Sequence, residues 1–361
     1  MNLHSRTLSS AYMHWAKSQG SINYNLAVSG IPDYPLNEIP YRPEDIVLSG
    51  SGSYGYPPLL QAIASRYNIS PDSVVTTLGA SMANYLVMAL LLQPGDEVLI
   101  EHPAYELFVS TAMFLGASVK RFERKFENGF QVKVTELEKI ITPKTKLIVV
   151  TNLHNPTSVY TDEKSIKQLG ELARSAGAKV LVGEVYLNTV FDRNPFTALH
   201  LGDEFITTNS LTKAYGLSGL RLGWICAEPE IARKLWRMID LLYVNHGTLS
   251  ERLGVRAFEY LETIVARSKA ILDTNRALFN KFLDERNDIE CISPEYGTVR
   301  FPRLKHGNVD RLVSVLRSKY DTLVAPGSYF EMPEHFRIGL CCKPEIFEEG
   351  LKRLGRGLDE V

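Results

Sequence analysis

Residues 207–224 read TTNSLTKAYGLSGLRLGW, and this stretch carries the strongest indication of the fold. It combines the end of an expected buried strand, a lysine (Lys213), a turn punctuated by glycines, and an arginine (Arg221) eight residues after the lysine. An isolated lysine is usually a solvated surface charge. Here the lysine follows the carboxyl end of an expected parallel strand, which is where open α/β sheets bind ligands. The stretch therefore predicts a ligand site at the edge of a sheet.

The flanking sequence alternates between strand-like and helix-like patterns. From about residue 57 to 226 this alternation is typical of βαβ units. Lys146–Thr151 (KLIVVT) is apolar over most of its length, as expected for a parallel strand buried on both faces. The expected strands are 74–77, 97–100, 118–122, 146–151, 179–182, 205–209 and 221–226. We therefore predict an α/β fold with a mostly parallel sheet of seven strands covered by helices.

The length favours two domains. The chain has 361 residues, more than the roughly 100–200 that are usual for one domain. After Pro229 the pattern changes to long amphipathic helices and short strands, without repeats or low-complexity segments. We expect a large ligand-binding domain at 40–245 and a smaller α+β domain formed by 1–39 and 246–361.

Charge and cysteine content limit the partners. Lys and Arg number 40 and Asp and Glu 41, so the net charge of −1 favours a small-molecule ligand and neither nucleic acid nor an anionic membrane. The four cysteines form no CxxC pair, which favours buried thiols in a reducing compartment and no metal site. The first 20 residues lack the apolar stretch of a signal peptide, and the longest apolar run, 85–92, is too short to span a bilayer. We expect a cytoplasmic protein.

Two local motifs suggest other chemistry. Residues 50–55 (GSGSYG) match the GxGxxG of dinucleotide-binding proteins, but no clear first strand precedes them. Residues 210–213 (SLTK) match the SxxK of penicillin-binding enzymes, but they end an expected strand and no KTG is present. No HExxH or GxSxG occurs. A nicotinamide-dependent dehydrogenase built on Gly50 stays open as a minor alternative.

The stretch 207–224 resembles the Schiff-base segment of fold-type-I enzymes that use pyridoxal 5′-phosphate (PLP), in particular the class I/II aminotransferases. The resemblance implies that Lys213 forms the Schiff base with PLP. It also implies that Ser210 and Arg221 hold the cofactor phosphate.

Other segments resemble the same family in the same order along the chain. Residues 76–108 resemble its phosphate-binding turn and cofactor-stacking loop. Gly79, Ala80 and Ser81 begin an expected helix, whose first N–H groups favour phosphate. Tyr105 stands where the family has an aromatic ring stacked on the pyridine, although a tyrosine in the core is the alternative explanation.

Three further side chains complete the implied site. Asn155, in an NPT motif, and Tyr186, in GEVY, match residues that bind the phenolic oxygen of PLP. Arg337, in HFRIG, matches the arginine that binds the substrate α-carboxylate with two parallel hydrogen bonds. Residues 25–35 and 54–67 also resemble the family, so the likeness covers nearly the whole chain.

The sequence departs from the family at two important positions. Gly183 stands where the family has an aspartate that pairs with the pyridine nitrogen and keeps it protonated. Glu184 is adjacent, but neighbouring residues of a strand face opposite sides, so we do not expect it to substitute. Gly50 stands where a tyrosine often reaches the phosphate across a dimer interface, and Tyr54 is a candidate replacement.

The resemblance implies a homodimer that transfers the amino group of an α-amino acid to an α-keto acid. Its activity is impaired if Gly183, in place of the aspartate, leaves the pyridine nitrogen less protonated and the ring a poorer electron acceptor. Gly183 itself is either an altered residue or a natural feature of an enzyme with a less protonated ring. The alternatives are a PLP-dependent lyase, decarboxylase or synthase, and a non-catalytic small-molecule-binding protein. Four side chains are candidates for the substrate pocket, although core packing explains each equally well: Tyr24, Tyr105, Tyr243 and His246.

Overall fold

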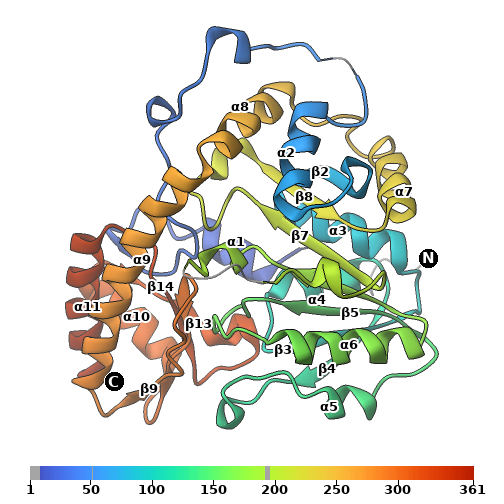
Figure 1. Ribbon diagram of the computed structural model, residues 1–361. Helices are drawn as coiled ribbons and strands as arrows, with labels where there is room; N and C mark the ends of the chain where they lie inside the picture. The colour runs from blue at the N-terminus through green and yellow to red at the C-terminus, as the bar shows by residue number, and fades with distance from the viewer. Residues whose placement is uncertain (1–8, 51, 192–195) are drawn as a thin grey trace.

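The computed structural model describes residues 9–50, 52–191 and 196–361. Its centre is a seven-stranded sheet in the order β2-β8-β7-β6-β5-β3-β4 (Figure 1). Strand β8 runs antiparallel to both of its neighbours, and the remaining pairs are parallel. The strands are β2 (Val74–Leu78), β3 (Glu97–His102), β4 (Ser118–Glu123), β5 (Thr145–Thr151), β6 (Lys179–Gly183), β7 (Phe205–Ser210) and β8 (Leu222–Cys226). The predicted α/β fold with a mostly parallel sheet is confirmed.

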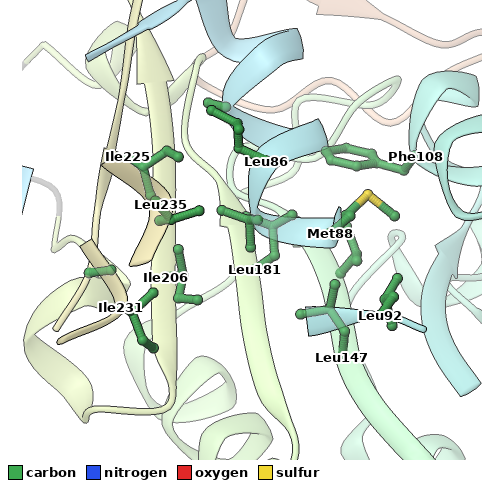
Figure 2. Packing of buried hydrophobic residues seen from close by; sticks show 14 of the residues in the cluster. Leu86, Met88, Leu92, Phe108, Leu147, Leu181, Ile206, Ile225, Ile231 and Leu235 are labelled. Carbon is green, nitrogen blue, oxygen red and sulfur yellow. The ribbon is translucent and has the colours of Figure 1, made fainter. Parts of the chain in front are cut away.

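Helices cover both faces of this sheet. The helices of the chain are α1 (Ala11–Lys17), α2 (Pro57–Tyr67), α3 (Gly79–Leu91), α4 (Glu106–Phe114), α5 (Val134–Glu138), α6 (Glu163–Ser175), α7 (Pro229–Ile239), α8 (Thr248–Glu259), α9 (Leu261–Asp284), α10 (Val309–Tyr320) and α11 (Pro344–Leu358). Helices α3, α4 and α7 pack on one face in the cluster that includes Leu147 and Leu181 (Figure 2). Helices α5 and α6 pack on the opposite face with Ile148 and Val180. Neighbouring residues of β5 thus enter different cores, which is why its sequence is apolar without alternation.

A second core lies among the C-terminal helices and short strands. Helices α9, α10 and α11 enclose buried side chains that include Leu272, Leu312 and Leu354. The short strands are β1 (Tyr24–Asn25), β9 (Ile289–Glu290), β10 (Val299–Arg300), β11 (Arg303–Leu304), β12 (Thr322–Leu323), β13 (Ala325–Pro326) and β14 (Phe336–Gly339). Strand β1 pairs with β12, so the N-terminal segment joins this C-terminal part although some 300 residues separate them in the sequence.

The two competing motifs do not have the structural context that their chemistry needs. Residue 51 lies outside the described residues; Gly50 and residues 52–55 lie outside the sheet, between a short 3-10 helix at Pro43–Asp45 and helix α2. This is not the strand, glycine loop and helix of a dinucleotide-binding unit. Ser210 is the last residue of β7 and no α-helix begins there, so the SxxK interpretation is also wrong.

Candidate active site

A cavity of about 330 Å³ lies at the carboxyl ends of β5, β6 and β7. We call it the site cavity. Its walls include Thr151, Gly183 and Ser210, which are the last residues of these three strands. The predicted site residues that line it are Ala80, Ser81, Tyr105, Asn155, Tyr186, Ser210, Lys213 and Arg221. Residues distributed over more than 140 positions of sequence are therefore brought to one place, the edge where parallel sheets bind ligands.

Lys213 presents its amine inside the cavity. Its Nζ donates a hydrogen bond to Ser29 Oγ at 3.0 Å. Burial lowers the pKa of Lys213, because a charged ammonium loses hydration there. Tyr186 is also buried at the cavity, and burial raises the pKa of its phenol. A less basic amine and a neutral phenol thus line the same cavity.

The cavity wall at Arg221 and the start of α3 favours an anion. Gly79 begins α3 with φ at +78°, and an added Cβ there would lie 2.5 Å from Arg221 Nη2. A Cβ on Gly223 would lie 2.5 Å from the carbonyl carbon of Gly79. Only glycines permit this close approach of β8, the Arg221 side chain and the start of α3. The N-terminus of α3 and the Arg221 guanidinium both favour a phosphate.

Arg337 lies on β14 and is fully buried beside the cavity. Its Nη2 donates to the Tyr12 hydroxyl at 2.7 Å and to the Ala27 carbonyl at 3.0 Å. Its Nη1 donates to Asn155 Oδ1 at 3.2 Å. Its Nε has no hydrogen-bond partner within the described residues. Arg337 forms no ion pair with a carboxylate in the described part of the chain, so its buried guanidinium is a suitable receptor for one.

An aromatic wall borders the cavity. Tyr105 meets the ring of Tyr12 edge to face at a centroid distance of 6.1 Å and that of Phe108 at 6.0 Å. Trp15 stacks on Tyr12 at 6.1 Å. This packing fixes the Tyr105 ring in the wall of the cavity.

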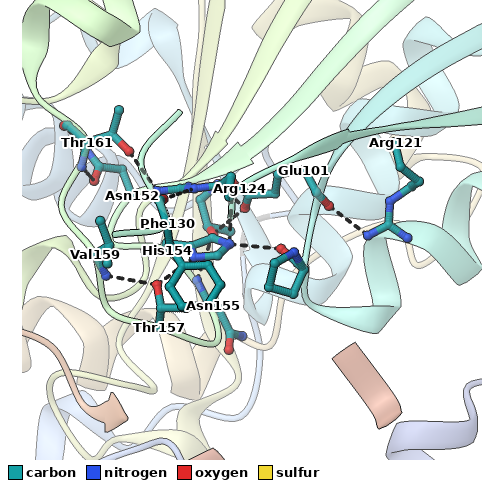
Figure 3. A network of polar contacts seen from close by, with 12 residues as sticks. Glu101, Arg121, Arg124, Phe130, Asn152, His154, Asn155, Thr157, Val159 and Thr161 are labelled. Atoms are coloured by element: carbon teal, nitrogen blue, oxygen red, sulfur yellow. Dashed lines mark hydrogen bonds and ion pairs between the residues drawn. The ribbon is translucent and has the colours of Figure 1, made fainter. Parts of the chain in front are cut away.

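A buried polar network holds the loop that carries Asn155 (Figure 3). Arg124 pairs with Glu101 at 2.7 Å, and both side chains are excluded from solvent. His154, one residue before Asn155, contacts Thr157 Oγ1 and the Pro103 carbonyl at 2.7 and 2.9 Å. Because a partly satisfied network of this kind is costly, its full pairing fixes the position of Asn155.

Gly183 leaves an open position in the wall. Its register partners are Thr151 on β5 and Thr208 on β7. A Cβ at this position would lie 3.2 Å from Thr151 Cγ2 and 3.5 Å from Phe108 Cζ. The backbone of Gly183 does not adopt a positive φ, so other residues fit its conformation. The position therefore faces a methyl group and a phenyl edge.

Glu184 faces away from the cavity, as the alternation of strand side chains predicts. Its carboxylate accepts hydrogen bonds from Ala198 N at 2.9 Å and from Thr197 Oγ1 at 2.9 and 3.1 Å. Burial raises its pKa to about 7. Glu184 thus does not replace a carboxylate at position 183.

Several expected positions lie elsewhere. Of the four candidate substrate-pocket side chains only Tyr105 lines the site cavity. Tyr24 lies beneath the Arg353 guanidinium, Tyr243 borders the core below α3 and α7, and His246 contacts the Thr77 carbonyl. Tyr54 does not line the cavity of its own chain, because its hydroxyl contacts Asp240 Oδ2 at 2.9 Å.

Sequence reasoning missed several cavity residues, notably Ser29, Tyr12, Thr151 and Asn84. Only Asn84 carried a signal, because it is a polar residue inside an otherwise apolar helix. Tyr12 and Ser29 come from the N-terminal segment, and only the pairing of β1 with β12 brings that segment near.

Within the described residues no helix is long and apolar enough to cross a membrane. The same part of the chain holds no group of histidine, cysteine or acidic side chains arranged for a metal ion. All four cysteines are free thiols.

The cavity residues fit PLP. The Lys213 amine, the start of α3 with Arg221, and the aromatic wall correspond to the aldehyde, phosphate and ring of that cofactor; Ala80, Ser81 and Arg221 line the cavity, whereas the predicted Gly79 lies just outside its lining. The volume is within the range of small-molecule sites. The orphaned Nε of Arg337 adds a place for a carboxylate.

Comparisons with known proteins agree with a PLP site. The family model for aminotransferase class I and II matches residues 47–354. The chain is 30% identical to the capreomycidine synthase of Streptomyces vinaceus, covering 92% of this chain and 89% of the relative. It is 28% identical to an aspartate aminotransferase of Sulfolobus acidocaldarius, with the same coverages.

Solved structures give the same result. A PLP-dependent aminotransferase from Streptococcus suis 89-1591 superposes with a TM-score of 0.91, at 27% identity over 97% of both chains. An aromatic aminotransferase from Pyrococcus horikoshii OT3 shares the fold, with a TM-score of 0.86, at 22% identity over 97% of this chain and 99% of that one.

The chain belongs to the class I and II aminotransferase family. Within that family it is a PLP-dependent enzyme of fold type I.

Proposed function

We propose that this enzyme transfers the amino group of an α-amino acid to an α-keto acid, with Lys213 as the residue that holds PLP and moves the proton. The observation that carries the proposal is one cavity that joins the Lys213 amine to the Asn155–Arg337 pair. PLP, when bound, supplies an electron-accepting ring conjugated to the reacting carbon.

The residues divide between binding and proton transfer. Ser81, Ser210, Arg221 and the N–H groups at the start of α3 hold the phosphate. Asn155 and Tyr186 would hydrogen-bond the phenolic oxygen, and Tyr105 would pack against the ring. Arg337 orients the substrate carboxylate through its fork of N–H donors.

Lys213 has two tasks. Its amine is the group that would hold the cofactor aldehyde. As a free amine inside the cavity it would also accept the proton from the substrate Cα and later donate it back. Burial supports this role, because a lowered lysine pKa increases the fraction of neutral amine that can accept a proton.

The test is transfer of ¹⁵N from a mixture of labelled amino acids to added 2-oxo acids, followed by mass spectrometry with PLP-loaded protein. Labelled amino acids should form from the 2-oxo acids, and Lys213→Ala should abolish both this transfer and the visible absorbance of bound cofactor. Lys234→Ala, on the surface of α7 beside Glu230, is the matched control. Release of CO₂ or ammonia without amino transfer would replace this proposal with a decarboxylase or lyase.

We also propose that the enzyme is a homodimer. Exposed apolar side chains concentrate in two segments, one before α2 and one after α7. Leu48 in the first segment is 89% exposed, and Leu241 and Val244 in the second are 82% and 61% exposed. The Tyr54–Asp240 hydrogen bond connects these segments. Light scattering should give twice the chain mass, and Leu241→Asp should lower it toward the monomer.

A further inference from the structure

The side chain of Asn84, held by Thr208, reaches the region that Gly183 leaves open. Thr208 is the register partner of Gly183 on the neighbouring strand, and paired residues of parallel strands face the same side of a sheet. The Thr208 hydroxyl donates a hydrogen bond to Asn84 Oδ1 at 2.7 Å. Asn84 and Gly183 both line the site cavity. Asn84 therefore stands over the strand position where the side chain is missing.

Asn84 is placed there by its helix. It follows Ser81 by three residues and Ala80 by four, so the three share one face of α3, and all three line the cavity. The buried side chains of the same helix are apolar, including Ala83, Leu86 and Val87. Asparagine is a weaker helix former than leucine, so helix propensity does not explain its presence.

The orientation of the amide defines what it can bind. Oδ1 is used by Thr208, which leaves the Nδ2 group as a donor. Nδ2 has no protein partner among the described residues, and Asn84 is only half-buried. A neutral N–H donor thus faces the cavity beside Gly183.

We propose that Asn84, held by Thr208, donates a hydrogen bond to the ring nitrogen of the cofactor and thereby keeps that nitrogen largely unprotonated. This inference rests on the proposed function, in which Lys213 holds the aldehyde. The aldehyde carbon and the ring nitrogen lie on opposite sides of the pyridine ring, so the nitrogen faces away from Lys213. An N–H donor binds a neutral nitrogen, whereas a carboxylate would stabilise a protonated one.

The decisive measurement is the ¹⁵N chemical shift of the ring nitrogen in holoenzyme loaded with ring-labelled PLP, at a fixed pH of 7.5. The wild-type signal should lie in the range of a neutral pyridine. Asn84→Asp places a carboxylate at the same point and should move the signal toward the protonated range. Tyr85→Phe changes a polar residue of α3 that does not line the cavity, and it should leave the signal unchanged.

Cofactor affinity gives a second measurement. Asn84→Leu removes the donor within an apolar helix and should weaken PLP binding about tenfold, the loss expected for one hydrogen bond. Circular dichroism and thermal unfolding confirm that the variant is folded. If Asn84→Leu binds PLP as tightly as the wild type, or if the wild-type nitrogen is protonated while amino transfer proceeds, the inference fails and the proposed function survives. If the protein forms no complex with PLP, both fail.

Discussion

The hydroxyl of Thr151 donates a hydrogen bond to Oε1 of Glu101 at 2.6 Å, and the backbone N–H of Thr151 donates to the same atom at 2.8 Å. Glu101 lies on β3 and Thr151 ends β5, so these bonds join the ends of two paired strands at the site cavity. The same hydroxyl accepts a hydrogen bond from Asn155 N at 3.0 Å. A buried carboxylate is thus connected to Asn155 through one threonine.

This connection predicts a large effect of Glu101→Gln. The glutamine retains the shape but leaves the buried Arg124 guanidinium without a counter-charge. Removing one partner of such a pair costs about 3–5 kcal/mol of the free energy of unfolding. Urea unfolding at pH 7 measures the loss, and Glu136→Gln, in an exposed pair with Lys139, is the control. A loss below about 1 kcal/mol would contradict an essential role for the pair.

Gly183→Asp should increase the rate of amino transfer. The backbone admits an aspartate, and the 3.2 Å contact with the Thr151 methyl group requires a shift of a few tenths of an ångström. The new carboxylate would stabilise a protonated ring nitrogen, and we expect a rate increase of about tenfold together with tighter PLP retention. Gly183→Ala adds the same Cβ without charge and should not increase the rate. Equal rates in all three proteins would argue against a function for charge at this position.

Glu184 should make the folded state less stable as pH rises. Its pKa is about 7 in the folded protein against an ordinary 4.5, so the folded state binds the proton more tightly. The contribution of the Glu184 carboxyl to the free energy of unfolding is therefore fully present below pH 4.5 and is lost as the pH rises to about 7. The difference corresponds to about 3 kcal/mol.

Glu184→Gln should remove this dependence. We would measure the free energy of unfolding in guanidinium from pH 4.5 to 8. Across that interval the value for the variant, relative to the wild type, should rise by about 3 kcal/mol. The exposed substitution Glu171→Gln serves as the comparison. Parallel stability curves for wild type and Glu184→Gln would show that the carboxyl has an ordinary pKa.

Arg337→Lys should impair substrate binding. Lysine keeps the charge but loses the guanidinium fork, and the hydrogen bonds to Tyr12 and Asn155 cannot both be kept. We expect kcat/KM for the amino acid substrate to fall about 100-fold, or about 2.7 kcal/mol, while PLP still binds. Arg353→Lys, on α11 outside the cavity, should have little effect. Loss of PLP binding in Arg337→Lys would instead assign Arg337 to the cofactor.

The sequence predicted the sheet because its signals are local. A continuous apolar run such as that of β5 can be buried only between two helical layers, and Gly216, with a φ of +70°, marks a turn that few other residues could form. Even here the boundaries were shifted. Arg221 was expected in a strand, but its φ of +46° ends a 3-10 helix and β8 begins at Leu222.

By itself, the sequence determined the α/β architecture, the family and the lysine, asparagine, tyrosine and arginine positions that the cavity brings together. Only the tertiary structure decided that Ser29 and Tyr12 share the cavity, that Glu184 faces away from it, and that Tyr24, Tyr243 and His246 lie outside it. The physical reason is the range of the interactions. Periodicity and turn residues act between neighbours in the chain, whereas a cavity is assembled from segments whose contacts depend on strand order, register and the packing of α3 on the sheet.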